Sequence, residues 1–108
     1  MKTQPLISTG ILIILFLFRV IIVPVVEEIL FRELFFSFLA KCSDASFAHF
    51  LSAFLFAFAH LSRGYMMLFL SFFFAIMLTT LRNVSESITP SIFAHIGVNF
   101  LAFLFPIT

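Results

Sequence analysis

The sequence predicts an all-α fold, a bundle of about four transmembrane helices. Hydrophobic residues make up 63% of the chain and charged residues only 10%, whereas a soluble domain carries about 25% charged residues. The apolar residues fall in long runs that are separated by short polar turns. Each run approaches or exceeds the length of about 20 residues with which a helix crosses a bilayer. We therefore expect a multi-pass integral membrane protein, with one transmembrane core domain over residues 1–108.

The first apolar run covers residues 6–40 and is longer than one crossing requires. Pro24 lies inside this run, and proline lacks the N–H that an α-helix needs, so we expect a kink there. The run forms either one long tilted helix or two elements that meet at the proline. Residues 41–44 are a short polar turn.

Three further helices are expected, over residues 45–62, 65–81 and 87–105. Arg63 and Gly64 separate the first two of them, and residues 82–86 form the next predicted turn. Pro90 falls in the first turn of the last helix, where proline is tolerated, and Pro106 follows its end.

Charge and cysteine content exclude several classes of function. The formal net charge is +1, so no basic surface indicates binding of nucleic acid. Cys42 is the single cysteine, which rules out an internal disulfide and gives no cysteine spacing typical of a metal site.

Three charged residues, Glu27, Glu28 and Arg32, lie within one apolar run. A charge in the hydrocarbon core costs about 2.5–3.5 kcal/mol even on lenient insertion scales, so such residues need partners or a function. Glu28 and Arg32 are four residues apart, in the order that favours an ion pair on one helix face. We therefore expect these two to be structural and Glu27 to be available for chemistry.

Polar residues on the second and fourth helices share a face with small residues. His60 lies on the face of Ala53 and Phe56, and His95 and Asn99 lie together on another helix. Small residues mark the packed faces of membrane helices, so these polar groups should point into the bundle. Counting about 1.5 Å per residue from the turns brings Glu27, His60, His95 and Asn99 to similar depths.

These residues suit the hydrolysis of an acyl bond. Glu27 beside His60 can hold and deprotonate a water molecule, while His95 and Asn99 can donate hydrogen bonds to a developing oxyanion. Alternatively, Glu27, His60 and His95 could bind a divalent metal such as zinc, with an open position for water. The residues alone do not separate the two mechanisms.

Three ordered motifs resemble those of the CPBP family of intramembrane proteases, which comprises type II CAAX prenyl endopeptidases and bacteriocin-processing or Abi proteins. The motifs span most of the chain and read Glu27-Glu28-x-x-x-Arg32, Phe56-x-x-x-His60 and His95-x-x-x-Asn99. Glu33 departs from the family pattern, which commonly has glycine after the arginine. We expect Glu33 to stay outside the site and to alter helix packing or to pair with a neighbouring charge.

The resemblance implies a role for each motif residue. Glu27 and His60 would activate the water, and His95 and Asn99 would stabilise the oxyanion. The remaining motif residues would support them, with Glu28 and Arg32 as an ion pair and Phe56 positioning His60.

The resemblance also implies a substrate and a location. The substrate would be a membrane-embedded or lipidated peptide, either a prenylated CAAX-type protein or a bacteriocin-like one, cleaved in a bacterial plasma membrane. The family is often labelled metalloprotease, and a metal-free, glutamate-dependent mechanism is the alternative, so the cofactor is either a divalent metal or none.

Two other functions fit parts of the sequence. A non-catalytic relative acting as an immunity or scaffold protein would keep its activity when Glu27 is replaced by glutamine. A small proton-coupled multidrug exporter also has about four helices and a membrane glutamate, but it would not need His60, His95 or Asn99.

Overall fold

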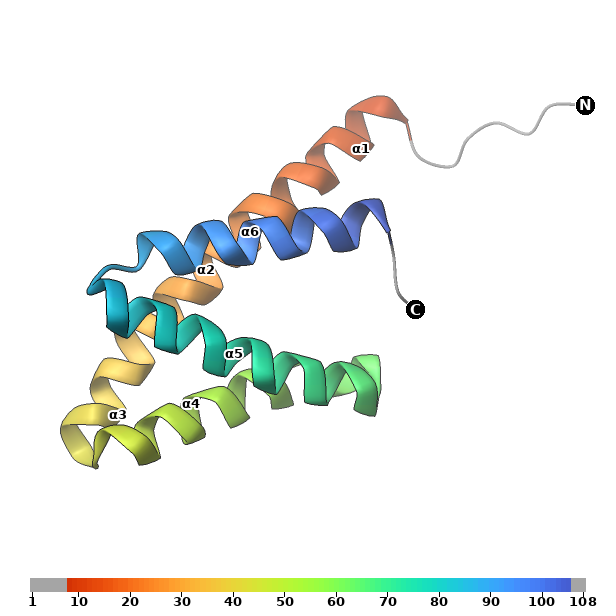
Figure 1. Cartoon of the computed structure of the whole chain (residues 1–108). Coiled ribbons are helices and arrows are strands. Elements are labelled where there is room, and N and C mark those ends of the chain that lie inside the picture. Colours follow the sequence, from red (N-terminus) through yellow and green to blue (C-terminus); the bar gives the residue numbers. More distant parts are fainter. Residues whose placement is uncertain (1–7, 106–108) are drawn as a thin grey trace, which may run out of the picture.

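A computed structural model describes residues 8–105, and within them all regular structure is helical (Figure 1). The residues expected before Ser8 in the first helix, and the expected helix stop at Pro106, lie outside the described part of the chain. The all-α prediction is confirmed for these residues.

The first element is one continuous helix of 34 residues, Thr9–Cys42, so Pro24 does not divide it. Two stretches are wound as π-helix, in which an N–H bonds to the carbonyl five residues earlier. Val23 N–H bonds to Phe18 O, and Phe36 N–H bonds to Phe31 O. The first π-helical stretch lies just before Pro24. Proline has no N–H to donate, so the regular α-helical hydrogen bonding is interrupted there. The segments are α1 (Thr9–Phe16), η1 (Leu17–Ile22), α2 (Val23–Glu28), η2 (Ile29–Phe35) and α3 (Phe36–Cys42).

The two π-helical stretches keep one line of side chains on the side of this helix that faces the other helices. Residues four apart in a regular α-helix drift by about 40° per step, so a line of five would rotate through about 160°. π turns hold more residues each and reduce this drift. The five members of the line are all buried, and they are Val20, Pro24, Glu28, Arg32 and Phe36.

The second helix, α4 (Ala45–Phe58), begins where predicted and ends four residues earlier than predicted. Asp44 caps its start, since its Oδ1 accepts a hydrogen bond from Phe47 N–H at 2.7 Å. At the other end, His60 has left the helical conformation, with φ −103° and ψ 9°, and its side chain bonds to a carbonyl of the last turn. A short 3-10 turn, η3 (Leu61–Arg63), and Gly64 at φ 102° then reverse the chain.

The third helix, α5 (Tyr65–Ser85), continues through residues for which the sequence predicted a turn. Arg82 is accommodated inside it because its Nε donates to Glu33 Oε1 on the long helix at 2.9 Å. The reversal occurs at Glu86, which has φ 55°. The last helix, α6 (Thr89–Leu104), begins two residues later than predicted, with Pro90 in its first turn as expected.

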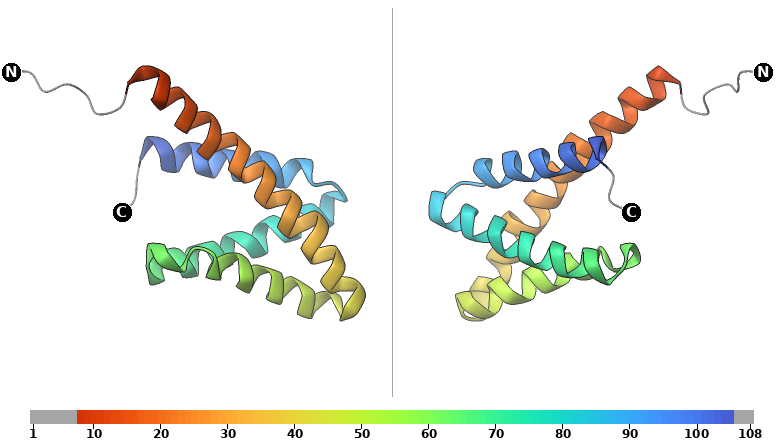
Figure 2. Two further views of the ribbon diagram at one scale, coloured as in Figure 1. Left: turned by 180° about the vertical axis from the view of Figure 1, so that it is seen from behind. Right: turned by 45° about the vertical axis from the view of Figure 1, so that its right-hand side comes forward.

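α4 and α5 form a hairpin, and the long helix Thr9–Cys42 runs diagonally across the bundle (Figures 1 and 2). α4 packs along α5, and α6 packs on both α5 and the middle of the long helix. Two helices, Thr9–Cys42 and Tyr65–Ser85, are long and apolar enough to cross a membrane, and only 11% and 22% of their most apolar windows are buried. A core helix of a soluble protein would be mostly buried, so these faces suit contact with lipid.

Candidate active site

Glu27 lies between two histidines that come from different elements. Its Oε2 is 4.0 Å from His60 Nε2, and its Oε1 is 3.6 Å from His95 Nε2. The long helix supplies the glutamate, the turn after α4 supplies His60, and α6 supplies His95. The convergence that the sequence predicted for these three residues is therefore present.

The orientation of the His60 ring is fixed by a hydrogen bond to its own helix. Nδ1 lies 2.9 Å from the carbonyl oxygen of Phe56. A carbonyl oxygen only accepts, so Nδ1 must carry the proton and donate it. In the neutral ring, Nε2 then presents its lone pair on the side of Glu27.

His95 is fixed in the same way, by a carboxylate instead of a carbonyl. Its Nδ1 lies 2.7 Å from Glu28 Oε2, and the residue is only 2% exposed. The ring of Phe74 on α5 packs edge-on against the imidazole, with 5.3 Å between the ring centroids. Both histidines thus have Nδ1 engaged by the protein and Nε2 turned toward Glu27.

Arg32 and Glu28 form an almost fully buried ion pair. Arg32 Nη1 lies 3.4 Å from Glu28 Oε2, with side-chain exposures of 1% and 0%. Arg32 Nη2 also donates to the carbonyl oxygen of Ala75 on α5, at 3.3 Å. Glu28 therefore contacts the arginine of its own helix and the histidine of α6 with the same oxygen.

Phe56 forms the apolar floor of the cluster. It is 1% exposed, and its ring lies 4.8 Å from the His60 ring and 5.9 Å from the His95 ring. The Arg32 guanidinium carbon lies 4.8 Å from the centre of the same ring, within the range of a cation–π contact. One aromatic side chain thus contacts both histidines and the buried arginine.

Asn99 is anchored outside this cluster. Its Nδ2 donates to the backbone oxygen of Arg19 on the long helix at 3.1 Å. Among residues 8–105, no hydrogen bond joins Asn99 to Glu27, His60 or His95. The amide lies one helical turn from His95 on α6, and it retains a second N–H that this bond does not use.

The contributions of α5 carry no signal in the sequence. Phe74 packs on a histidine and Ala75 offers only a backbone carbonyl, so neither residue type indicated a site.

Glu33 was expected to stay outside the site, and its side chain pairs with Arg82 at 2.9 Å. At the position where this chain departs from the resembled family, Glu33 therefore has a charged partner on α5.

A metal site is not preformed in the described residues. Between Ser8 and Phe105, no group of three or more His, Cys, Asp or Glu side chains is arranged as ligands around one point. Glu27, His60 and His95 supply the right donor atoms, but their present spacing is that of direct side-chain contact.

Access to the site is from the Glu27 and His60 side. These two side chains are 22% and 20% exposed, whereas Glu28, Arg32 and His95 are at most 3% exposed. A substrate would therefore meet Glu27 and His60 first, with the side chains of Glu28, Arg32 and His95 behind them.

Comparison with known proteins identifies the family. The family model for Rce1-like type II CAAX prenyl endopeptidases matches residues 9–101, which include every residue of the cluster. No curated protein and no solved structure matches the chain. The matched family consists of membrane proteins that cleave membrane-associated prenylated proteins. The chain belongs to the Rce1-like family of type II CAAX prenyl endopeptidases.

Proposed function

We propose that this protein is an intramembrane endopeptidase that hydrolyses a peptide bond of a prenylated, membrane-associated substrate. The observation that carries the proposal is the pair of oriented imidazoles whose Nε2 atoms lie 4.0 Å and 3.6 Å from Glu27. An exporter that relies on a lone membrane glutamate has no need of this arrangement.

Glu27 and His60 are the groups that activate water. Their facing atoms are 4.0 Å apart, so a water oxygen can lie within hydrogen-bonding distance of both. Each atom accepts a hydrogen from that water, and the two acceptors together increase its nucleophilicity. Their partial exposure lets water enter, while the buried groups behind them exclude bulk solvent.

The reaction then follows the usual course of amide hydrolysis. The water oxygen attacks the carbonyl carbon while Glu27 takes the proton, which gives a tetrahedral intermediate with a negative oxygen. The C–N bond breaks, and Glu27 returns the proton to the leaving nitrogen. The products are a new carboxylate and a free amine.

His95 and Asn99 stabilise the negative oxygen of the intermediate. Donation from His95 Nε2 requires a proton on that nitrogen while Nδ1 still donates to Glu28. Asn99 contributes its second N–H, and its bond to Arg19 holds the amide in place.

Glu28 and Arg32 act as positioning residues. Arg32 ties Glu28 to α5 through the Ala75 carbonyl, and Glu28 in turn fixes the imidazole of His95. This chain of contacts connects three helices behind the reacting atoms. We expect its loss to weaken folding and catalysis together.

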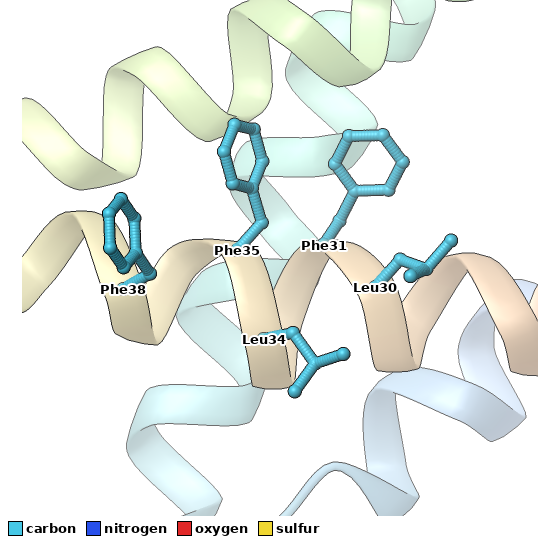
Figure 3. Close-up of a pocket in the computed structure, with 5 residues that line it drawn as sticks. All are labelled: Leu30, Phe31, Leu34, Phe35 and Phe38. Atoms are coloured by element: carbon cyan, nitrogen blue, oxygen red, sulfur yellow. The ribbon is translucent and has the colours of Figure 1, made fainter.

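An apolar groove beside the site suits the isoprenyl chain of the substrate. It has a volume of about 380 Å³ and lies along the long helix, beginning one turn from Glu27 (Figure 3). Phe31 in its wall also packs edge-on against Phe56, with 5.3 Å between the ring centroids. The groove therefore adjoins the apolar floor of the cluster. The lining residues are Leu30, Phe31, Leu34, Phe35 and Phe38.

A divalent metal, if the enzyme uses one, would be held by Glu27, His60 and His95. It would polarise the carbonyl and lower the pKa of its bound water.

We further propose that α4 and α6, with 14 and 16 residues, cross the membrane together with the two longer helices.

The test is cleavage of peptides in proteoliposomes, with one peptide prenylated on a cysteine near its C-terminus and an unmodified copy. We expect the wild type to cleave the prenylated peptide faster, and Glu27→Gln and His60→Ala to abolish cleavage. Each protein is assayed with and without a strong chelator, which separates metal-dependent from glutamate-only chemistry. Cleavage that persists in both variants would show that the activity does not belong to this site.

A further inference from the structure

A second line of side chains runs along the long helix, directly beside the buried line. Its members are also four residues apart, and they are Arg19, Val23, Glu27, Phe31 and Phe35. Each precedes a buried residue of the first line by one position, and the buried line keeps its side of the helix from residue 20 to residue 36. Arg19 therefore lies on the same edge of the helix as Glu27, two turns nearer the N-terminus.

α6 borders this edge from Glu27 to Arg19. At one point His95 Nε2 lies 3.6 Å from Glu27, and one turn further along α6 Asn99 donates to the backbone oxygen of Arg19. The two helices thus run antiparallel along this stretch. We call the edge of the long helix between Arg19 and Glu27, together with its continuation to Phe31 and Phe35, the path. His95 and Asn99 of α6 lie beside the part between Arg19 and Glu27.

The two ends of the path differ in chemistry. Beyond Glu27 in the C-terminal direction, Phe31 and Phe35 lead into the apolar groove (Figure 3). In the other direction the path ends at Arg19, whose side chain is exposed and forms no ion pair among residues 8–105. The other two arginines on packed helix faces both have carboxylate partners, Arg32 with Glu28 and Arg82 with Glu33.

An arginine in this position calls for an anionic partner. Arg19 lies within an apolar helix, where a cation costs a few kcal/mol unless it is compensated. Guanidinium binds carboxylate through two parallel hydrogen bonds, a geometry that lysine cannot reproduce. The Asn99 bond uses only the backbone of Arg19, so the guanidinium remains available to a ligand.

We infer that Arg19 binds the free C-terminal carboxylate of the substrate and thereby sets where the peptide is cut. This inference rests on the proposed function. The lipid-modified part of the substrate then occupies the groove, the scissile bond lies at Glu27, and the C-terminus extends toward Arg19. Eight residues separate Glu27 from Arg19, about 12 Å along the helix. An extended peptide covers about 3.3–3.6 Å per residue, so a short C-terminal segment follows the scissile bond.

The experiment compares a farnesylated peptide that has a free C-terminal carboxylate with the same peptide as its C-terminal amide. Wild type, Arg19→Gln and Arg19→Lys are assayed in proteoliposomes. We expect wild type to favour the free acid by at least about tenfold in kcat/KM, in the range of a charge-assisted hydrogen bond. Arg19→Gln should lose this preference because its rate falls far more on the acid than on the amide, and Arg19→Lys should retain only part of the preference.

Arg63→Gln is the matched control, because Arg63 is an exposed arginine in the turn between α4 and α5 and does not belong to the long helix. It should keep the wild-type preference for the acid. Mass spectrometry of the released fragment should show a short peptide that ends at the original C-terminus. Equal rates on acid and amide in the wild type would overturn the inference. So would an equal loss on both peptides in Arg19→Gln, which would assign Arg19 to an anionic lipid headgroup or to folding.

Binding to Glu27→Gln separates this inference from the proposed function. The variant keeps the shape of the site but lacks the proposed base, so affinity for a fluorescent copy of each peptide can be measured without cleavage. We expect the free acid to bind at least about tenfold more tightly than the amide, and a second Arg19→Gln substitution to remove the difference. Preferential binding without wild-type cleavage would refute the protease assignment alone, whereas cleavage without any preference would refute the role of Arg19 alone.

Discussion

Two adjacent glutamates have opposite environments in this protein, and the difference comes from their positions around one helix. Neighbouring residues on a helix point about 100° apart. Glu28 is 0% exposed and contacts Arg32 and His95, whereas Glu27 is 22% exposed and faces two Nε2 atoms. One carboxylate is therefore fixed within the packed interior, and the other is open to water and substrate.

Replacing Glu28 should destabilise the protein far more than replacing Glu33. Glu28→Gln leaves the buried Arg32 charge without its partner, for which we expect a loss of about 3–5 kcal/mol in the free energy of unfolding. Glu33→Gln breaks a partly exposed pair with Arg82 and should cost about 1 kcal/mol or less. Reversible unfolding by denaturing detergent measures both. Similar losses in the two variants would contradict the structural role assigned to Glu28.

At the scale of single helices, the sequence predicted the elements better than their ends. The helical runs and their order were evident because apolar residues and polar turns mark them directly. The turn predicted at residues 82–86 lies at residues 86–88 instead, and Arg82 within the longer helix has a partner in Glu33, far away in the sequence. α4 ends early because the His60 side chain bonds to a carbonyl of the last turn, a local contact that apolar patterning does not reveal.

The candidate site was predictable to the extent that polar residues marked it. Glu27, His60 and His95 are polar residues in apolar surroundings, and the structure brings them together. The contact between His95 and Glu28 and the part played by α5 were not predictable. They depend on the π turns of the long helix and on a backbone carbonyl, neither of which leaves a pattern in side-chain type.

Phe56 connects α4 to the rest of the site, and its removal should affect stability and turnover together. Phe56→Ala deletes a fully buried ring that contacts both histidines, so we expect a loss of about 3–5 kcal/mol and a lower kcat. Phe54→Ala, on the exposed face of the same helix, should cost about 0.5 kcal/mol or less. Detergent-induced unfolding and cleavage assays on both variants test this. A kcat in Phe56→Ala equal to that of Phe54→Ala would contradict the role of Phe56 as the floor of the site.

At the scale of the whole molecule, the apolar outer surface and the charged interior are the reverse of a soluble protein. Large apolar side chains such as Phe73, which is 65% exposed, cover the outside, while Glu28, Arg32 and His95 are buried. This distribution is stable where the surroundings are hydrocarbon and water is confined to the polar centre.

Tryptophan fluorescence can test this placement, because the chain has no native tryptophan. Phe73→Trp, in the middle of α5, should be quenched by brominated lipid and protected from the aqueous quencher acrylamide. Tyr65→Trp, at the start of the same helix, should be more accessible to acrylamide, since it lies at the end of a predicted span. Strong acrylamide quenching of the Phe73→Trp variant would argue against a membrane-spanning α5.

The most direct test of the central claim is the rate of peptide hydrolysis by Glu27→Gln relative to wild type, measured in water enriched in ¹⁸O. Glu33→Gln is the control for the same chemical change in the same helix. We predict that wild type and Glu33→Gln both place the isotope in the new carboxylate, and that Glu27→Gln is slower by about 10²–10⁴-fold, the usual contribution of a general base. Hydrolysis by Glu27→Gln at the rate of Glu33→Gln would show that Glu27 does not activate the water.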